Sequence, residues 1–137
     1  MVSSALDLLS HPAWVPLWVA MGAIPGALAR HYILTWCNRQ WEGAFPWSTL
    51  GVNCSGSVLL GYCAAVVHPH LPGLNALLAM GFISSYTTFS TYALELSLLR
   101  RQRRYLTLLL YGLGSPLAGF LGVEGGIALG GGLVSHG

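Results

Sequence analysis

A dense run of hydroxyl side chains is the first feature of this sequence that could do chemistry. Six of the eight residues from Ser84 to Thr91 are Ser or Thr, inside an otherwise apolar stretch. Hydroxyls compete with the backbone for hydrogen-bond partners, so a run of six weakens a helix. Two structures stay open: a helix whose hydroxyls bond within it, or a break whose free amides would bind an anion and whose carbonyls would bind a cation.

Other polar and aromatic residues are spaced to meet this run. Three sets have a helical spacing of three or four residues, which brings the members of each set to one face: Thr49, Asn53 and Ser57; Phe89 and Tyr92; Tyr111 and Ser115. Amide N–H groups, hydroxyls and the positive edges of aromatic rings are all uncharged donors. Each ring pair alone is most often core packing, but the combination suits a small anion better than a cation.

The composition indicates what kind of element must position these groups. The chain is 54% hydrophobic and 7% charged, with a mean hydropathy of +0.62, whereas an average soluble domain carries about 25% charged residues. All six basic residues are Arg and they are scattered, so there is no extended basic face for a nucleic-acid backbone. We therefore predict an all-α integral membrane protein, and we exclude a soluble enzyme, a nucleic-acid binder and a disordered chain.

Four stretches are apolar over the roughly 20 residues that a membrane helix needs: residues 14–34, 50–67, 74–99 and 105–128. Polar or proline-rich turns separate them, and Trp and Tyr residues lie near their ends, where the headgroup region favours such rings. We predict one four-helix transmembrane domain over residues 1–137, with its third helix broken mid-membrane. Gly22 and Gly26 have the small-residue spacing that lets membrane helices pack closely and favours self-association.

Three segments, in this order, resemble the CrcB/Fluc family of fluoride channels. They read GAIPGALARHY at residues 22–32, STLGVNCSGS at residues 48–57, and GF at residues 81–82 followed by TTFSTYALE at residues 87–95. The resemblance covers essentially the whole chain. It implies a passive, fluoride-selective channel in the inner (plasma) membrane that exports fluoride and so lowers its cytoplasmic concentration. It also implies an antiparallel dimer in which both chains build two pores.

The resemblance further implies roles for particular residues. It assigns these residues to the fluoride pathway: Arg30, Asn53, Thr88, Phe89, Ser90, Tyr92, Tyr111 and Ser115. Asn53 would donate to fluoride, and Arg30 would shape the vestibule that attracts the anion. The backbone carbonyls of Ser84 and Thr87, from both subunits, would hold one structural Na⁺ at the dimer axis.

Two positions depart from the family pattern. Tyr92 stands where Phe is usual, so its hydroxyl would line the pathway or narrow it. Ser84 and Ser85 stand where a glycine pair is usual, and a backbone with positive φ would disfavour serine by roughly 1–2 kcal/mol. Glu95 matches an acidic residue of the family's third helix, and no catalytic partner for it is evident in the sequence.

Other membrane functions stay open as alternatives. A small four-helix, dual-topology multidrug or cation exporter depends on an acidic residue in its first membrane helix, and residues 14–34 contain none. A non-transporting assembly subunit would explain the small-residue spacing but not the hydroxyl run. A membrane enzyme is disfavoured because His68 and His70 lie in a proline-rich loop with no acid or Cys nearby to complete a metal site. The sequence has no nucleotide-binding G-x-x-x-x-G-K-[ST] loop, which favours passive conduction.

The arginines predict one orientation in the membrane. Arg39 and the four arginines of residues 100–104 lie in loops that face the same side of a four-span chain, whereas the termini and the middle loop contain no Arg or Lys. The positive-inside rule then places both Arg-bearing loops in the cytoplasm and both termini outside. An antiparallel homodimer needs chains inserted both ways. The strong bias therefore favours pairing with an oppositely oriented homologue over pairing with a second copy.

Overall fold

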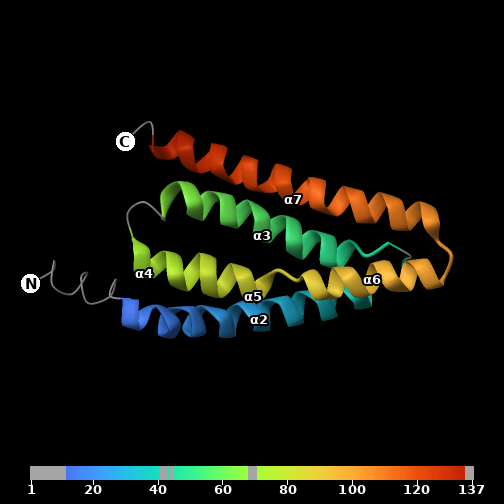
Figure 1. Cartoon of the computed structure of the whole chain (residues 1–137), viewed down its shortest axis with the longest axis horizontal. Coiled ribbons are helices and arrows are strands. Elements are labelled where there is room, and N and C mark those ends of the chain that lie inside the picture. Colours follow the sequence, from blue (N-terminus) through green and yellow to red (C-terminus); the bar gives the residue numbers. More distant parts are fainter. Residues whose placement is uncertain (1–11, 41–42, 44, 68–70, 135–137) are drawn as a thin grey trace, which may run out of the picture.

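The structure is a computed structural model that describes residues 12–40, 43, 45–67 and 71–134, and the elements within these ranges are helical. His68 and His70 lie outside the described residues. Figure 1 shows the elements in chain order. They are η1 (Pro12–Trp14), α2 (Val15–Gln40), α3 (Trp47–Val66), α4 (Pro72–Asn75), η2 (Ala76–Ile83, a π-helix), α5 (Ser84–Tyr86), α6 (Phe89–Arg101) and α7 (Tyr105–Val134).

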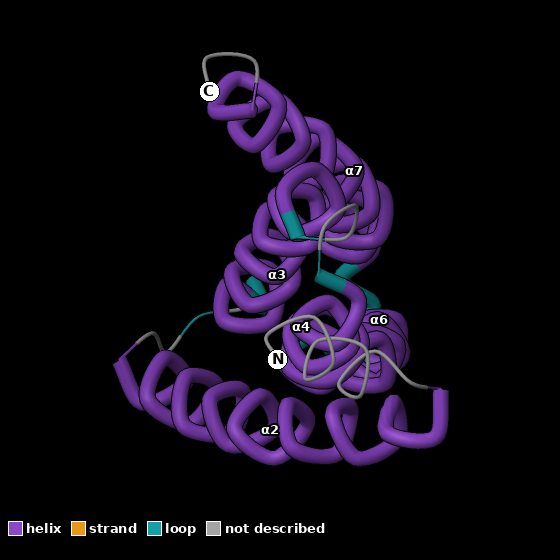
Figure 2. The backbone as a smooth tube through the Cα atoms, turned by 90° about the vertical axis from the view of Figure 1, so that its left-hand side faces the viewer, coloured by secondary structure: helices purple, strands orange, loops and turns teal. Residues whose placement is uncertain are grey.

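The elements α4, η2, α5 and α6 follow one another end to end and form one interrupted rod (Figure 1). The helix α3 packs along α7, and α2 packs on η2 and α5. Figure 2 shows that α2 crosses beneath the rod and that α7 lies on the opposite side of the molecule. The all-α prediction is confirmed for the described residues.

Glycines make the two main helix contacts close. A Cβ at Gly22 would overlap the backbone carbonyl of Leu77, and one at Gly26 would overlap that of Phe82, so α2 and η2 touch backbone to backbone. The close packing predicted from the Gly22 and Gly26 spacing is therefore confirmed. The contact between α3 and α7 is built in the same way, because a Cβ at Gly126 would overlap the carbonyl of Val58.

We expect Gly126→Ala to lower the thermal stability of the protein, because the added methyl group forces α3 and α7 apart. Overpacking of this kind typically costs about 1–3 kcal/mol. Gly125→Ala is the matched control, since a Cβ at Gly125 meets open space. The measurement is the melting temperature of each purified variant in detergent. Equal melting temperatures for the two variants would contradict the close contact.

The outer surface of the fold is apolar and the buried interior includes polar groups. Large apolar side chains follow one exposed stripe of α2: Leu17, Met21, Ile24, Leu28, Tyr32 and Trp36. Thr49 and Tyr111, by contrast, are fully buried. Two helical segments, Trp47–Val66 and Tyr105–Gly132, are long and apolar enough to cross a membrane. An exposed apolar surface of this extent requires lipid or another protein to cover it.

Two helices extend beyond the predicted spans. The helix α2 continues through Asn38 to Gln40, beyond the predicted end of this span at residue 34. The side chain of Asn38 accepts a hydrogen bond of 2.6 Å from Ser48 Oγ, which ties the last turn of α2 to the first turn of α3. The helix α7 continues through its glycines to Val134. Glycine lowers the propensity for helix, but here Gly126 and Gly130 pack against α3, and that contact compensates.

The third predicted helix is broken, as the hydroxyl run indicated. Thr87 (φ −73°, ψ 157°) and Thr88 (φ −146°, ψ 117°) are extended, between the end of α5 and the start of α6. The side chain of Thr88 caps α6 by accepting from the backbone N–H of Thr91 at 3.3 Å. Of the two open structures, the break is confirmed, and it lies at these two threonines.

The serine pair before the break is helical. Ser84 has φ −64° and ψ −33°, and among the described non-glycine residues only Arg103 has a positive φ. The break therefore does not use the left-handed backbone that would disfavour serine. Ser85 adds a tertiary contact, because its hydroxyl donates to the carbonyl of Ala23 on α2 at 2.9 Å.

The arginine-bearing ends of the helices lie together. The end of α2 and the connection between α6 and α7 are at one end of the molecule, and the start of α2 and the end of α7 are at the other (Figure 1). Arg39 belongs to the last turn of α2, and Arg100 and Arg101 to the last turn of α6.

Candidate functional site

Asn53 on α3 brackets the break from the side. Its Nδ2 donates to the carbonyl of Thr88 at 3.1 Å, and its Oδ1 accepts from the N–H of Thr88 at 2.8 Å. In a continuous helix that N–H would donate to the carbonyl of Ser84. Asn53 therefore takes the place of the helical hydrogen bond and holds the chain extended. Its amide carries two N–H groups, and these two bonds use one of them.

A cavity of about 380 Å³ opens beside the bracketed backbone, and we call it the break cavity. It draws residues from α3, from the break, from α6 and from α7: Asn53, Gly56, Ser57, Leu60, Ile83, Ser84, Thr87, Thr88, Phe89, Tyr92, Ser115, Pro116 and Gly119. Five predicted pathway residues and both predicted carbonyl ligands thus meet at one place. Three predicted pathway residues do not line it: Arg30, Ser90 and Tyr111.

Aromatic rings form one wall of the break cavity. The ring centroids of Phe89 and Tyr92 lie 5.7 Å apart at 44°, and those of Tyr92 and Tyr111 lie 5.2 Å apart. Phe89 is 78% exposed in the single chain. The hydroxyl of Tyr92 donates to the carbonyl of Gly112 at 2.7 Å. The proton of this O–H group is therefore already donated to the backbone of α7.

Glu95 has two partners that its sequence context did not reveal. Thr49 on α3 donates to Glu95 Oε1 at 2.7 Å, and Tyr111 on α7 donates to Glu95 Oε2 at 2.6 Å. The carboxylate thus joins α3, α6 and α7. The face shared by Thr49 and Asn53 was the only sequence signal for this contact, since each pairing spans at least 16 residues of chain.

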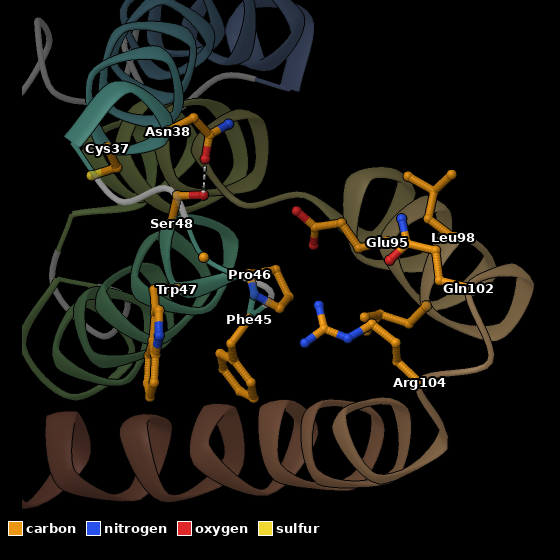
Figure 3. A pocket seen from close by; sticks show the side chains of 12 residues that line it. Cys37, Asn38, Phe45, Pro46, Trp47, Ser48, Glu95, Leu98, Gln102 and Arg104 are labelled. Atoms are coloured by element: carbon orange, nitrogen blue, oxygen red, sulfur yellow. Dashed lines mark hydrogen bonds between the residues drawn. The ribbon is translucent and has the colours of Figure 1, made fainter.

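A second pocket of about 630 Å³ lies at the arginine-bearing end, and we call it the arginine-end pocket. Figure 3 shows Glu95 and Arg104 extending into it from one side, opposite Phe45, Pro46 and Ser48. Glu95 lines the arginine-end pocket and is two side-chain contacts away from the break cavity. Its partner Tyr111 contacts the ring of Tyr92, which lines the break cavity.

Arg30 lies at the break and not in the arginine-end pocket. Its Nη1 donates to the carbonyl of Thr87 at 3.4 Å. Arg104 is the arginine that lines the arginine-end pocket. The vestibule role that the family resemblance implies for Arg30 stays a prediction. Ser90 also lies beside the break, within 3.3 Å of the hydroxyl of Thr88.

The break also presents carbonyl oxygens that fit a hard cation. Because the N–H of Thr88 donates to Asn53, the carbonyl of Ser84 loses its usual helical donor. The carbonyl of Thr87 follows in extended backbone and keeps one lone pair beside its contact with Arg30. Backbone oxygens suit Na⁺, and two from one chain leave the coordination to be completed by other ligands. No cluster of three or more His, Cys, Asp or Glu occurs among the described residues.

The comparisons identify the family of this arrangement. Residues 17–127 match the model of the family described as CrcB-like protein, Camphor Resistance (CrcB). That range contains the break and every residue of the break cavity. The chain belongs to the CrcB family.

Individual relatives of this CrcB chain are similar over most of their length. The fluoride-specific ion channel FluC of Synechococcus sp. (strain JA-2-3B'a(2-13)) is 44% identical over 125 residues, which are 89% of this chain and 96% of the relative. The FluC of Synechocystis sp. is 45% identical over 111 residues, which are 79% and 85% of the two chains. The FluC of Trichormus variabilis is 36% identical over 119 residues.

Membership of the CrcB family and the apolar helices together make this chain a membrane protein. Its named relatives are ion channels and not enzymes. The recognition of the CrcB/Fluc family from three short segments is thereby confirmed.

Proposed function

We propose that this CrcB chain forms a passive, fluoride-selective channel that exports fluoride across the inner (plasma) membrane and lowers its cytoplasmic concentration. The relatives named as fluoride-specific ion channels support this proposal. The observation that carries it is the broken helix, which Asn53 brackets and which opens onto a cavity lined by Phe89, Tyr92 and Ser115.

The chemistry of this cavity suits fluoride. Fluoride is compact and strongly hydrated, so a path for it must replace water with several close donors and yet release the ion. The free N–H of Asn53, the hydroxyl of Ser115 and the ring edge of Phe89 are uncharged donors of this kind. No Arg or Lys lines the break cavity among the described residues, so the side chains that would contact the ion there are neutral.

The path we propose starts in the arginine-end pocket. Arg104 raises the local concentration of anions there. The ion then passes Tyr111 and enters the break cavity beside Tyr92. Thr88, Phe89, Ser90 and Ser115 follow along the break and α7. Arg30 acts at the break, where its charge attracts the anion and its contact with Thr87 positions the backbone.

Four membrane crossings and an antiparallel dimer complete this proposal. The crossings are α2, α3, the interrupted rod from Pro72 to Arg101, and α7. The high exposure of Phe89 supports a partner chain that covers it. An exposed ring can line a pore only where a second chain closes the other side of that pore. One Na⁺ at the dimer axis would bind the carbonyls of Ser84 and Thr87 from both chains, and its charge would offset part of the cost of bringing anions into a low dielectric.

The partner is an oppositely oriented homologue in this proposal. The end that carries Arg39 and the arginines of residues 100–104 faces the cytoplasm by the positive-inside rule. A chain with so strong a bias inserts in one orientation, so a second copy inserted the other way is disfavoured.

We expect liposomes that contain the purified chain together with its oppositely oriented homologue to release fluoride and not chloride, measured with ion-selective electrodes. Protein alone is compared with protein co-reconstituted with a CrcB homologue whose arginines have the opposite bias. Flux only in the mixed sample supports the heterodimer, and robust flux from the single chain with loops accessible on both sides contradicts it. Absence of fluoride flux in both samples contradicts the channel.

A further inference from the structure

The interior of α7 contains a proline that removes a hydrogen bond. Pro116 has no N–H, so the carbonyl four residues earlier, that of Gly112, has no donor from its own helix. In lipid there is no water to replace such a donor, and an unpaired carbonyl is therefore costly. The structure supplies one from another helix, because the hydroxyl of Tyr92 donates to the Gly112 carbonyl at 2.7 Å.

The same two residues line the break cavity. Tyr92 and Pro116 both belong to its wall, on α6 and α7 respectively. The ring of Tyr92 also lies between Phe89, at 5.7 Å, and Tyr111, at 5.2 Å, measured between ring centroids. The hydrogen bond to Gly112 is thus a third contact that holds the Tyr92 ring in place, in addition to its two aromatic neighbours.

We propose that Tyr92 and Pro116 form a matched pair in which the tyrosine hydroxyl replaces the helical donor that the proline removes, and in which this bond sets the position of the Tyr92 ring in the ion path. Tyr92 is then a positioning residue: its O–H is not offered to the anion, and its ring presents the pore wall at a fixed distance from α7. The role in the ion path rests on the proposed fluoride channel, whereas the pairing itself does not.

The pairing gives the hydroxyl of Tyr92 a role that phenylalanine could not fill. Phenylalanine would present a similar ring but leave the Gly112 carbonyl without a donor for as long as residue 116 is proline. The bond also joins α6 to α7 across 20 residues of chain, next to the end of the break. Loss of the hydroxyl therefore frees both the ring and the first turns of α6.

A double-mutant cycle tests the pairing. The variants are Tyr92→Phe, Pro116→Ala and the double variant, with Tyr32→Phe as a control, because Tyr32 is 68% exposed on α2 and does not line the break cavity. We expect Tyr92→Phe to lower the melting temperature by about 3–6 °C. In the Pro116→Ala background the loss should be at most half as large, because the new N–H can donate to Gly112. Tyr32→Phe should leave the melting temperature and the flux unchanged.

Ion selectivity tests the positioning role, since a merely structural bond would not change it. We expect Tyr92→Phe to reduce the ratio of fluoride to chloride efflux about three- to tenfold, and the double variant to recover most of that ratio. Equal stability losses in both backgrounds would overturn the pairing. Coupled stability losses with an unchanged ratio would overturn the positioning role. If the wild type releases no fluoride either alone or together with the oppositely oriented homologue, the proposed function fails, and the melting temperatures still decide the pairing.

Discussion

Asn53→Asp is expected to reduce fluoride efflux by about a hundredfold or more while the protein stays folded. The carboxylate keeps an acceptor for the N–H of Thr88, but it has no N–H for the Thr88 carbonyl, which Asn53 reaches at 3.1 Å. Two acceptors then face each other at the break. The substitution also places a negative charge on the wall of the break cavity, where it repels the anion.

A second substitution separates the effect of losing the hydrogen bonds between Asn53 and Thr88 from the effect of the added negative charge. Asn53→Leu removes both hydrogen bonds without adding charge, and the free N–H of Thr88 can then return to the carbonyl of Ser84. We expect an intermediate loss of efflux, about tenfold, the change that 1.4 kcal/mol would give. Asn75→Asp is the matched control for the charge, because Asn75 lies on α4 and lines neither pocket. Efflux from liposomes and elution as a folded oligomer are the two measurements.

The order of the two effects is the decisive result. If Asn53→Asp has lower fluoride efflux than Asn53→Leu, and Asn75→Asp has nearly the efflux of the wild type, the cavity carries an anion past Asn53. Equal efflux from Asn53→Asp and the wild type would place the path elsewhere in the molecule.

The break could be predicted from the sequence because its cause is local. A run of six hydroxyls lowers the preference for helix within the segment itself, and the structure has extended backbone at Thr87 and Thr88. Its position within the run could not be predicted, because a residue 35 positions earlier decides it. Asn53 takes the N–H of Thr88, and α6 starts directly after it.

Part of the set of donors around the break cavity could also be predicted, because helical spacing is a local pattern. Helical spacing puts Asn53 and Ser57 on one face, and both line the break cavity together with Ser115. The partners of Glu95 and the bond from Tyr92 to Gly112 were not predicted, because they join helices whose relative rotation no local pattern contains. The contact of Arg30 with the carbonyl of Thr87 was not predicted either, because it joins residues 57 positions apart.

The packing of the helices followed from small residues, but the length of the helices did not. Gly22 and Gly26 are four apart, and this spacing predicted close helix packing, which the structure places between α2 and η2. The ends of α2 and α7 depend on tertiary contacts such as the bond from Ser48 to Asn38, which holds the last turn of α2 in place.

Phe89→Ile is expected to reduce fluoride efflux at least tenfold with little change in melting temperature. Phe89 is 78% exposed in the single chain, so its ring contributes little to the packing of that chain. Its ring lines the break cavity and lies beside Tyr92, where the positive edge of an aromatic ring can face an anion. Isoleucine keeps an apolar side chain there but offers no such edge.

The matched control is Phe120→Ile on α7, a phenylalanine that is 62% exposed and lines neither pocket. Both variants are compared in liposomes at equal protein density, together with their melting temperatures and oligomeric state in detergent. Loss of efflux in Phe89→Ile alone, with the oligomer intact, assigns the ring to the ion path. Loss of the oligomer together with efflux would instead make Phe89 a contact of the partner chain. Wild-type efflux from Phe89→Ile would remove the ring edge from the mechanism, leaving hydroxyl and amide donors as the groups that replace the hydration of fluoride.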